Sequence, residues 1–267
     1  MNWIEALVLG LVQGLTEFLP VSSSGHLIIG KALLGVHVPP DAETTFEVLV
    51  HCATVLSTIV VFRNEIGKLL AGFFKFQWNE ETQYVLKICI SMIPVLIVGL
   101  FFKKQVEELF GEGVVLVGCM LIVTAILLTL THFVKFKQQK EISFLHAFII
   151  GVSQAIAVLP GLSRSGTTIS TGLLLGNRKE DVARFSFLMV LVPILGETLL
   201  NIKGGDFSPA VSGIPMLAMA TGFLAAFISG LFACKVMIQL VKNSKLIYFA
   251  IYCMAMGFFA LIYSFVK

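Results

Sequence analysis

Two short segments of this chain nearly repeat each other, and each one interrupts an apolar run with polar residues. The first covers residues 10–26 and reads GLVQGLTEFLPVSSSGH, and the second covers residues 151–167 and reads GVSQAIAVLPGLSRSGT. Five residues of the two copies match at a separation of 141: Gly10 with Gly151, Gln13 with Gln154, Ser22 with Ser163, Ser24 with Ser165, and Gly25 with Gly166. Polar side chains at membrane depth are costly and therefore mark functional positions by default. The duplication predicts two related halves with a polar site where the segments meet.

The composition indicates a helical integral membrane protein. The chain is 57% hydrophobic and only 13% charged, and its mean hydropathy is +0.93. A soluble domain with this composition would expose a mostly apolar surface. The net charge of +3 comes from basic residues near the predicted helix ends, which is typical of membrane topology and gives no reason to expect nucleic-acid binding.

Apolar runs predict six full membrane spans and four shorter segments. A span needs about 20 apolar residues. The predicted spans are residues 44–63, 84–102, 113–133, 182–202, 211–234 and 246–266. The shorter segments are residues 3–19, 24–36, 143–159 and 165–176.

The shorter segments fall into two pairs, one in each half, and each pair is joined by a repeated motif. A helix that ends at Pro20 or Pro160 cannot continue through the serines and glycines that follow. We therefore expect each pair to be a re-entrant hairpin, followed by three spans. Because three spans carry the chain to the opposite side of the membrane, the second half starts from that side. Residues 140–267 should therefore be inverted relative to residues 1–134 within a single membrane domain, 1–267, as in many transporters.

Lys and Arg residues predict the orientation. One face carries 13 of the 19: Arg63, Lys68, Lys75, Lys87, Lys135, Lys137, Lys140, Arg178, Lys179, Arg184, Lys235, Lys242 and Lys245. The other carries five: Lys31, Lys103, Lys104, Lys203 and Lys267, and Arg164, which lies in the second motif, is set aside. By the positive-inside rule the first face is cytoplasmic, so both termini and the mouth of the first hairpin face outward.

The first motif contains an intramembrane carboxylate. Gln13 and Glu17 are four residues apart and share one helix face. A polar packing pair would explain them, but the cost of an unpaired carboxylate favours a functional Glu17. Glu17 would either bind a divalent cation that also touches a phosphate or orient and deprotonate His26.

Three serines precede the next predicted helix, and they are Ser22, Ser23 and Ser24. One serine suffices as a helix N-cap, and three exceed that need. The N–H groups around Gly25 at a helix start form an anion site. His26 alone would be read as structural, but beside serines and a carboxylate it is a candidate base or nucleophile.

The second motif gives the stronger signal because it contains Arg164. A guanidinium stays charged and needs an anion, and its fork fits phosphate oxygens. A structural role would be an ion pair between Arg164 and Glu17, which we expect in the empty site and which does not exclude phosphate binding. Ser163, Ser165, Gly166 and Thr168 would complete a substrate-binding set with Gln13, Ser22, Ser24 and Gly25.

Three further ionisable residues lie in predicted spans. Glu47 is near a helix start, where it would stabilise the helix dipole or line a cavity. His51 and Glu197 are interpreted as contacts between helices or as supporting residues.

With both motifs in place, the chain resembles the undecaprenyl-diphosphate phosphatase family of bacteria, the bacitracin-resistance (BacA/UppP) type, over essentially its whole length. The resemblance rests on Gln13-x-x-x-Glu17 followed by PVSSSGH, and on PGLSRSGTT, which covers residues 160–168. Many members have Glu where this chain has Gln13, so one carboxylate fewer is present here.

The resemblance implies a metal-dependent membrane enzyme that removes the terminal phosphate of the C55 lipid diphosphate and returns the carrier to peptidoglycan synthesis. It places the catalytic positions at Glu17, Ser23, His26 and Arg164, with a divalent cation, Mg²⁺ or Ca²⁺, near Glu17. We expect Ser23 as nucleophile with His26 as its base, oriented by Glu17; attack by His26 itself stays open, as does ligation of the metal by Gln13.

The same resemblance implies the bacterial inner (plasma) membrane, with a site reached from the outer side and a polyprenyl diphosphate as substrate. Association into a homo-oligomer stays open. The rival interpretation is a transporter or lipid flippase, because inverted repeats and broken helices suit that class equally well. A transporter needs weak, reversible binding and has no use for a serine–histidine pair beside an arginine.

Overall fold

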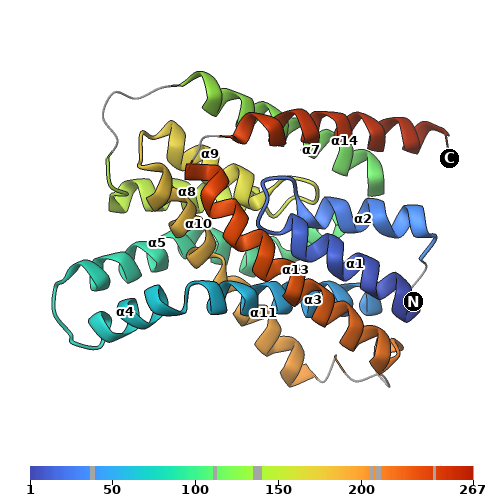
Figure 1. The fold of residues 1–267 in the computed structure, drawn as a ribbon, viewed down its shortest axis with the longest axis horizontal. Helices are drawn as coiled ribbons and strands as arrows, with labels where there is room; N and C mark the ends of the chain where they lie inside the picture. The colour runs from blue at the N-terminus through green and yellow to red at the C-terminus, as the bar shows by residue number, and fades with distance from the viewer. Residues whose placement is uncertain are drawn as a thin grey trace.

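The computed structural model of the 267-residue chain describes residues 1–36, 40–110, 113–134, 140–204, 207, 212–242 and 245–266. These residues form a bundle of helices (Figure 1). The first half contains α1 (Trp3–Thr16), α2 (Ser23–Leu34), α3 (Pro40–Val61), α4 (Arg63–Phe73), α5 (Glu80–Phe101), α6 (Lys103–Phe110) and α7 (Gly113–Phe133). The second contains α8 (Phe144–Ile156), α9 (Arg164–Leu174), α10 (Lys179–Met189), α11 (Leu191–Gly204), α13 (Met216–Lys242) and α14 (Leu246–Val266).

The prediction of six spans is confirmed among the described residues. Segments long and apolar enough to cross a membrane are Thr44–Val61, Glu80–Phe101, Gly113–Phe133, Lys179–Gly204, Met216–Val241 and Leu246–Val266. Residue 211, the expected start of the fifth span, lies outside the described residues, and α13 extends well past the expected end at 234.

The fourth span consists of two helices where one was expected. α10 ends at Met189 and α11 begins at Leu191, with Pro193 in its first turn. Proline has no N–H to donate and fits the first turn of a helix, where that N–H would have no intrahelical acceptor. Val190 lies at the break and Ile194 lies in the first turn of α11, and both line the pocket described below.

The four shorter segments are also helices, and each pair is joined by the expected turn. α1 has 14 residues and α8 has 13, too few for the roughly 20 that a span needs. Polar side chains fix where these helices begin: Asn2 caps α1, and Ser22, Ser143 and Ser163 cap α2, α8 and α9.

Glycines allow the short helices to pack closely on spans. At Gly10, a Cβ atom would lie 2.3 Å from the backbone oxygen of Gly222 on α13, and at Gly151 one would lie 2.3 Å from that of Ser91 on α5. α1 therefore packs on α13, α8 packs on α5, and α7 packs along α14 (Figure 1). The start of α1 and the end of α14 lie at the same end of the bundle, at the right of Figure 1.

The two motif turns meet between these helices. A Cβ atom at Gly25 would lie 3.1 Å from Cα of Gly161, and the Ser165 hydroxyl donates to the backbone oxygen of Leu19 over 3.1 Å. Gly161 has φ of +90°, and a Cβ there would lie 2.7 Å from Cα of Val117 on α7. Because only glycine tolerates both the φ angle and this approach, Gly161 brings the second motif against α7 and the first motif.

Candidate functional site

The carboxylate of Glu17 is the centre of the site, and four side chains from four helices contact it. Glu17 follows the last turn of α1. Its Oε1 accepts from Nη2 of Arg164 at 2.8 Å. Its Oε2 accepts from Oγ of Ser23 at 2.5 Å and from Nε2 of Gln13 at 2.9 Å, and Nε2 of His51 lies 3.4 Å away. The Glu17 side chain is only 9% exposed, so this carboxylate is held by protein groups rather than by water.

The ion pair expected between Arg164 and Glu17 is confirmed. Arg164 is the first residue of α9, and its side chain is 27% exposed. One N–H group of the guanidinium donates to Glu17. A guanidinium has five N–H donors arranged as a planar fork, so this hydrogen bond does not use all of them. An anion can therefore bind the same side chain while the ion pair persists or after it opens.

The turn at Ser22, just before α2, orients the side chain of Ser23 toward Glu17. Ser22 has φ of +67°, an uncommon conformation for a residue with a side chain, and its hydroxyl caps α2 by accepting from Gly25 N–H at 3.2 Å. The chain direction set by this turn brings Ser23 Oγ to the carboxylate. Ser24 Oγ lies 3.4 Å from Ser22 Oγ. The three serines thus differ in their contacts: Ser22 caps α2, Ser23 contacts the carboxylate of Glu17, and Ser24 lies next to Ser22.

The ring of His26 contacts Ser22 and Tyr252 rather than the expected Ser23 and Glu17. Its Nδ1 lies 2.8 Å from the backbone oxygen of Ser22, and its Nε2 lies 2.7 Å from the hydroxyl of Tyr252 on α14, whose ring stacks on it at 5.5 Å. Because a carbonyl only accepts, Nδ1 carries the hydrogen and Nε2 accepts from Tyr252. Both ring nitrogens are therefore engaged by Ser22 and Tyr252 rather than by Ser23 or Glu17.

The remaining residues of the second motif make internal contacts. Ser163 caps α9 by accepting from Gly166 N–H at 3.0 Å, and Ser165 binds the first motif turn. Thr168 contacts the backbone oxygen of Arg164 at 2.9 Å and the hydroxyl of Ser186 on α10 at 2.6 Å. These contacts fix the turn from which Arg164 projects.

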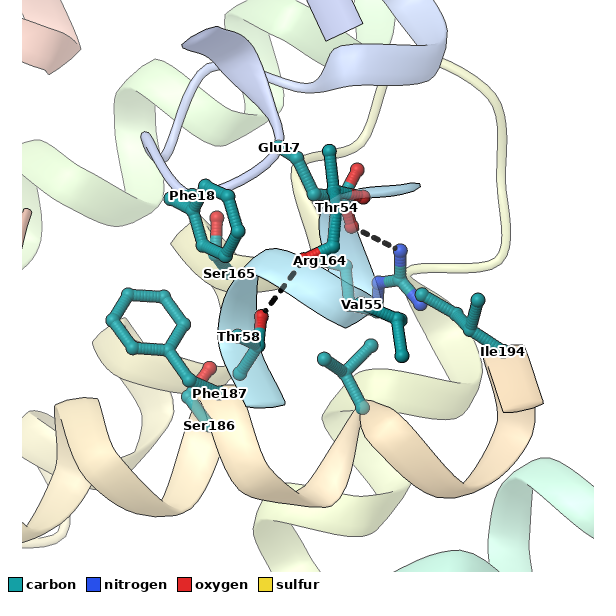
Figure 2. A pocket seen from close by; sticks show the side chains of 11 residues that line it. Glu17, Phe18, Thr54, Val55, Thr58, Arg164, Ser165, Ser186, Phe187 and Ile194 are labelled. Atoms are coloured by element: carbon teal, nitrogen blue, oxygen red, sulfur yellow. Dashed lines mark hydrogen bonds and ion pairs between the residues drawn. The ribbon is translucent and has the colours of Figure 1, made fainter. Parts of the chain in front are cut away.

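A small pocket lies beside the Glu17–Arg164 pair (Figure 2). Its polar lining consists of these two residues and the hydroxyl groups of Thr54, Thr58, Ser165 and Ser186. Its apolar lining consists of Phe18, Val55, Phe187, Val190 and Ile194, and the rings of Phe18 and Phe187 meet edge to face at 5.8 Å. Charged, hydroxyl and apolar side chains thus line the same pocket.

Reasoning from sequence did not place His51 and Tyr252 in the site. One feature of the sequence could have pointed to His51, because it is an ionisable residue inside a predicted span. Nothing in the sequence showed that it faces Glu17. Tyr252 lies 226 residues from His26. Glu47, which stayed ambiguous, forms an ion pair with Lys31 at 2.6 Å.

Groups that could hold a metal ion are sparse in the described part of the chain. It contains no cluster of three or more His, Cys, Asp or Glu side chains with suitable geometry. Gln13 is fully buried, however, and its Oε1 has no hydrogen-bond partner there. Both oxygens of Glu17 are already contacted by the four side chains named above, so a divalent cation held by Glu17 and Gln13 stays a prediction.

Together these features define a helical membrane protein in which an acid, a serine and an arginine meet beside a pocket that is apolar on one part of its lining. The chain belongs to the bacitracin resistance protein BacA family, whose model matches residues 6–259. It is 58% identical over 261 residues to an undecaprenyl-diphosphatase of Parabacteroides distasonis, with 96% of each chain covered. It is 53% identical over 267 residues to that of Christiangramia forsetii, with both chains fully covered, and 32% identical over 272 residues to undecaprenyl-diphosphatase 1 of Shouchella clausii, covering 99% of this chain and 97% of the relative.

Proposed function

We infer that this protein is an undecaprenyl-diphosphatase, a multi-pass enzyme of the bacterial plasma membrane that hydrolyses undecaprenyl diphosphate to undecaprenyl phosphate and inorganic phosphate. Full-length relatives at more than 50% identity carry that name. The observation in the site that supports the reaction is the contact of Glu17 with both Ser23 and Arg164. Hydrolysis would return the lipid carrier to cell-wall synthesis.

In the proposed reaction, Ser23 attacks the terminal phosphorus. The Oγ–P bond forms, the bond from that phosphorus to the bridging oxygen breaks, and undecaprenyl phosphate leaves with the bridging oxygen. The proton of Ser23 passes to Glu17, whose Oε2 already accepts that hydrogen bond at 2.5 Å. Water then cleaves the phosphoserine, which releases inorganic phosphate and restores the hydroxyl.

Glu17 thus replaces His26 as the proposed base, because it contacts Ser23 directly. His26 would act on the turn instead: it holds the backbone oxygen of Ser22, the residue before the nucleophile, and is itself held by Tyr252. Arg164 would bind the terminal phosphate through its planar fork and stabilise the charge that develops during transfer.

The substrate would lie with its diphosphate at Glu17 and Arg164 and its first isoprene units along the apolar lining. The rings of Phe18 and Phe187 offer that contact. This neighbourhood favours a lipid diphosphate over a soluble one, because a soluble diphosphate would leave the apolar lining uncovered.

A divalent cation, Mg²⁺ or Ca²⁺, stays part of the proposal. Gln13 Oε1, buried without a hydrogen-bond partner among the described residues, and the Glu17 carboxylate would supply oxygen ligands, and diphosphate oxygens would supply others. When bound, the cation would neutralise negative charge on the diphosphate.

We also propose that the halves are inverted repeats and that α1–α2 and α8–α9 are re-entrant hairpins. Support comes from reciprocal packing: α1 packs on α13 of the second half, and α8 packs on α5 of the first. The repeat-related glycines Gly10 and Gly151 make the close approach in both cases. Both termini would face outward, as the Lys and Arg distribution predicts, and the substrate would enter from the outer side.

Phosphate release by purified protein in detergent tests the function. Undecaprenyl diphosphate is supplied with Mg²⁺, with Ca²⁺, or with chelator, and Arg164→Ala serves as the control. Release that depends on Arg164 supports the phosphatase. Binding of the lipid diphosphate without release would instead indicate a transporter or lipid-binding protein.

A further inference from the structure

Two tyrosines of α14 contact α2, the helix that follows the turn at Ser22. The Tyr252 hydroxyl lies 2.7 Å from Nε2 of His26, in the first turn of α2. The Tyr263 hydroxyl donates to the backbone oxygen of Ala32 over 3.1 Å, in the last turn of α2. The two tyrosines are eleven residues apart, about three helical turns, so they project from the same face of α14. α14 therefore contacts α2 near both of its ends.

Tyr252 and Ser22 hold the His26 ring in one orientation. The Tyr252 ring stacks on the His26 ring, with centroids 5.5 Å apart and an angle of 10° between the planes. Nδ1 of His26 lies 2.8 Å from the backbone oxygen of Ser22, while Nε2 contacts the Tyr252 hydroxyl. His26 is only 7% exposed, so water has little access to these contacts. Both ring nitrogens and one ring face are thus engaged, which fixes the rotamer.

The position of His26 in turn holds the turn that orients Ser23. The backbone oxygen of Ser22 accepts from the backbone N–H of His26 at 3.1 Å and also contacts its ring. Ser22 has φ of +67°, and a residue with a side chain keeps such a conformation only where its surroundings hold it. The next residue is Ser23, whose Oγ donates to Oε2 of Glu17 at 2.5 Å. The contacts from Tyr252 to Glu17 therefore form one continuous series.

We propose that Tyr252 is a positioning residue for the nucleophile, a role that rests on the function proposed above, with Ser23 attacking phosphorus. The Tyr252 hydroxyl orients the ring of His26, the ring holds the backbone oxygen of Ser22, and the turn places Ser23 Oγ at Glu17. Tyr252 acts through His26 and does not touch the phosphate. α14 thereby contributes to the reaction from near the end of the chain.

The competing explanation is that Tyr252 only packs α14 against α2. Packing uses the ring, whereas positioning also needs the hydroxyl. Tyr252→Phe separates the two, because it keeps the stacked ring and removes the contact with Nε2 of His26. Tyr263→Phe is the matched control. It also removes a tyrosine hydroxyl between α14 and α2, but in the last turn of α2, away from the turn at Ser22.

The test measures kcat and KM for phosphate release from undecaprenyl diphosphate in detergent, together with thermal unfolding. We expect Tyr252→Phe to lower kcat by about 2- to 12-fold, the equivalent of one neutral hydrogen bond. KM should change little, because Arg164 and the apolar lining of the pocket are intact. Tyr263→Phe should keep kcat, and the two variants should unfold at similar temperatures.

A double-mutant cycle tests whether Tyr252 acts through His26. In His26→Ala, the partner of the hydroxyl is gone, so adding Tyr252→Phe should change the residual kcat little. A full loss from Tyr252→Phe in that background would overturn the proposed route. So would His26→Ala without any detectable turnover, because His26 would then be required for the chemistry itself.

The role of Tyr252 would also be overturned by an unchanged kcat in Tyr252→Phe, or by equal losses in the two tyrosine variants. A higher kcat in Tyr252→Phe would contradict it as well, since it would mean that the released Nε2 of His26 takes part directly. If Tyr252→Phe does not fold, Tyr252→Gln, which keeps a donor, is compared with Tyr252→Leu, and equal kcat in that pair would overturn the role. Activity of the unmodified protein and of Tyr263→Phe tests the proposed function separately.

Discussion

Replacing Arg164 distinguishes between two roles of its side chain. In one, which we call the clamp, two guanidinium N–H groups bind phosphate; in the other, the guanidinium only neutralises Glu17. Arg164 meets Glu17 through Nη2 at 2.8 Å, and lysine at this position would keep a positive charge but lose the planar fork. If phosphate binds to two N–H groups of the fork, Arg164→Lys loses one charge-assisted hydrogen bond, worth about 1.5–3 kcal/mol. That corresponds to a loss of roughly 10- to 150-fold in kcat/KM.

The free energy of unfolding reports on the second role of Arg164, its ion pair with Glu17. Removing one partner of a buried ion pair costs up to about 3–5 kcal/mol. The cost of Arg164→Ala should lie below that range, because the arginine is 27% exposed and His51 remains beside the carboxylate. Adding Glu17→Gln removes the uncompensated charge, so the double variant should be more stable than Arg164→Ala alone.

The assay combines phosphate release with thermal unfolding in detergent for Arg164→Lys, Arg164→Ala and the double variant. The clamp predicts a folded Arg164→Lys with most activity lost. Full activity in Arg164→Lys would refute the clamp and leave Arg164 only as a counter-ion of Glu17.

Three other predictions follow from single contacts. Gln13→Ala should lose activity modestly, whereas Glu17→Ala should lose about 10²-fold or more, as expected for an acid–base group; near-normal turnover by Glu17→Ala would contradict its assignment. Gly161→Ala should lower the thermal unfolding temperature more than alanine at an open helical glycine, because φ is +90° and the backbone of α7 is in contact; equal shifts would argue against that strain. In a variant without the five native cysteines, a cysteine replacing the exposed Lys68 should be shielded from an impermeant thiol reagent in intact cells, and one replacing Lys104 should react; the reverse pattern would invert the proposed topology.

Much of the fold was predictable because the bilayer dictates the length of an apolar span. The six spans and the four shorter helices appear where apolar runs and proline breaks placed them. The division of the fourth span was missed although Pro193 was visible, since a proline can kink a membrane helix or begin a new one. Only packing decides between these outcomes.

The sequence pointed to some residues of the candidate site, but it did not predict most of the contacts between them. Duplication and the cost of intramembrane charge singled out Glu17 and Arg164, and their ion pair is present. The partner of Ser23 was not predictable, because a turn at Ser22 with positive φ decides which hydroxyl meets the carboxylate. The contact between His26 and Tyr252 depends on how α2 meets α14, which no local pattern encodes.

The most direct measurement is the pair Ser23→Ala and Ser22→Ala, assayed for phosphate release from undecaprenyl diphosphate. Ser23 donates to Glu17 at 2.5 Å, whereas its neighbour Ser22 caps α2. Our account predicts that Ser23→Ala is inactive and properly folded, and that Ser22→Ala keeps substantial turnover with a helix-cap loss of about 1 kcal/mol in stability. Turnover by Ser23→Ala comparable to that of the unmodified protein would contradict Ser23 as the nucleophile activated by Glu17.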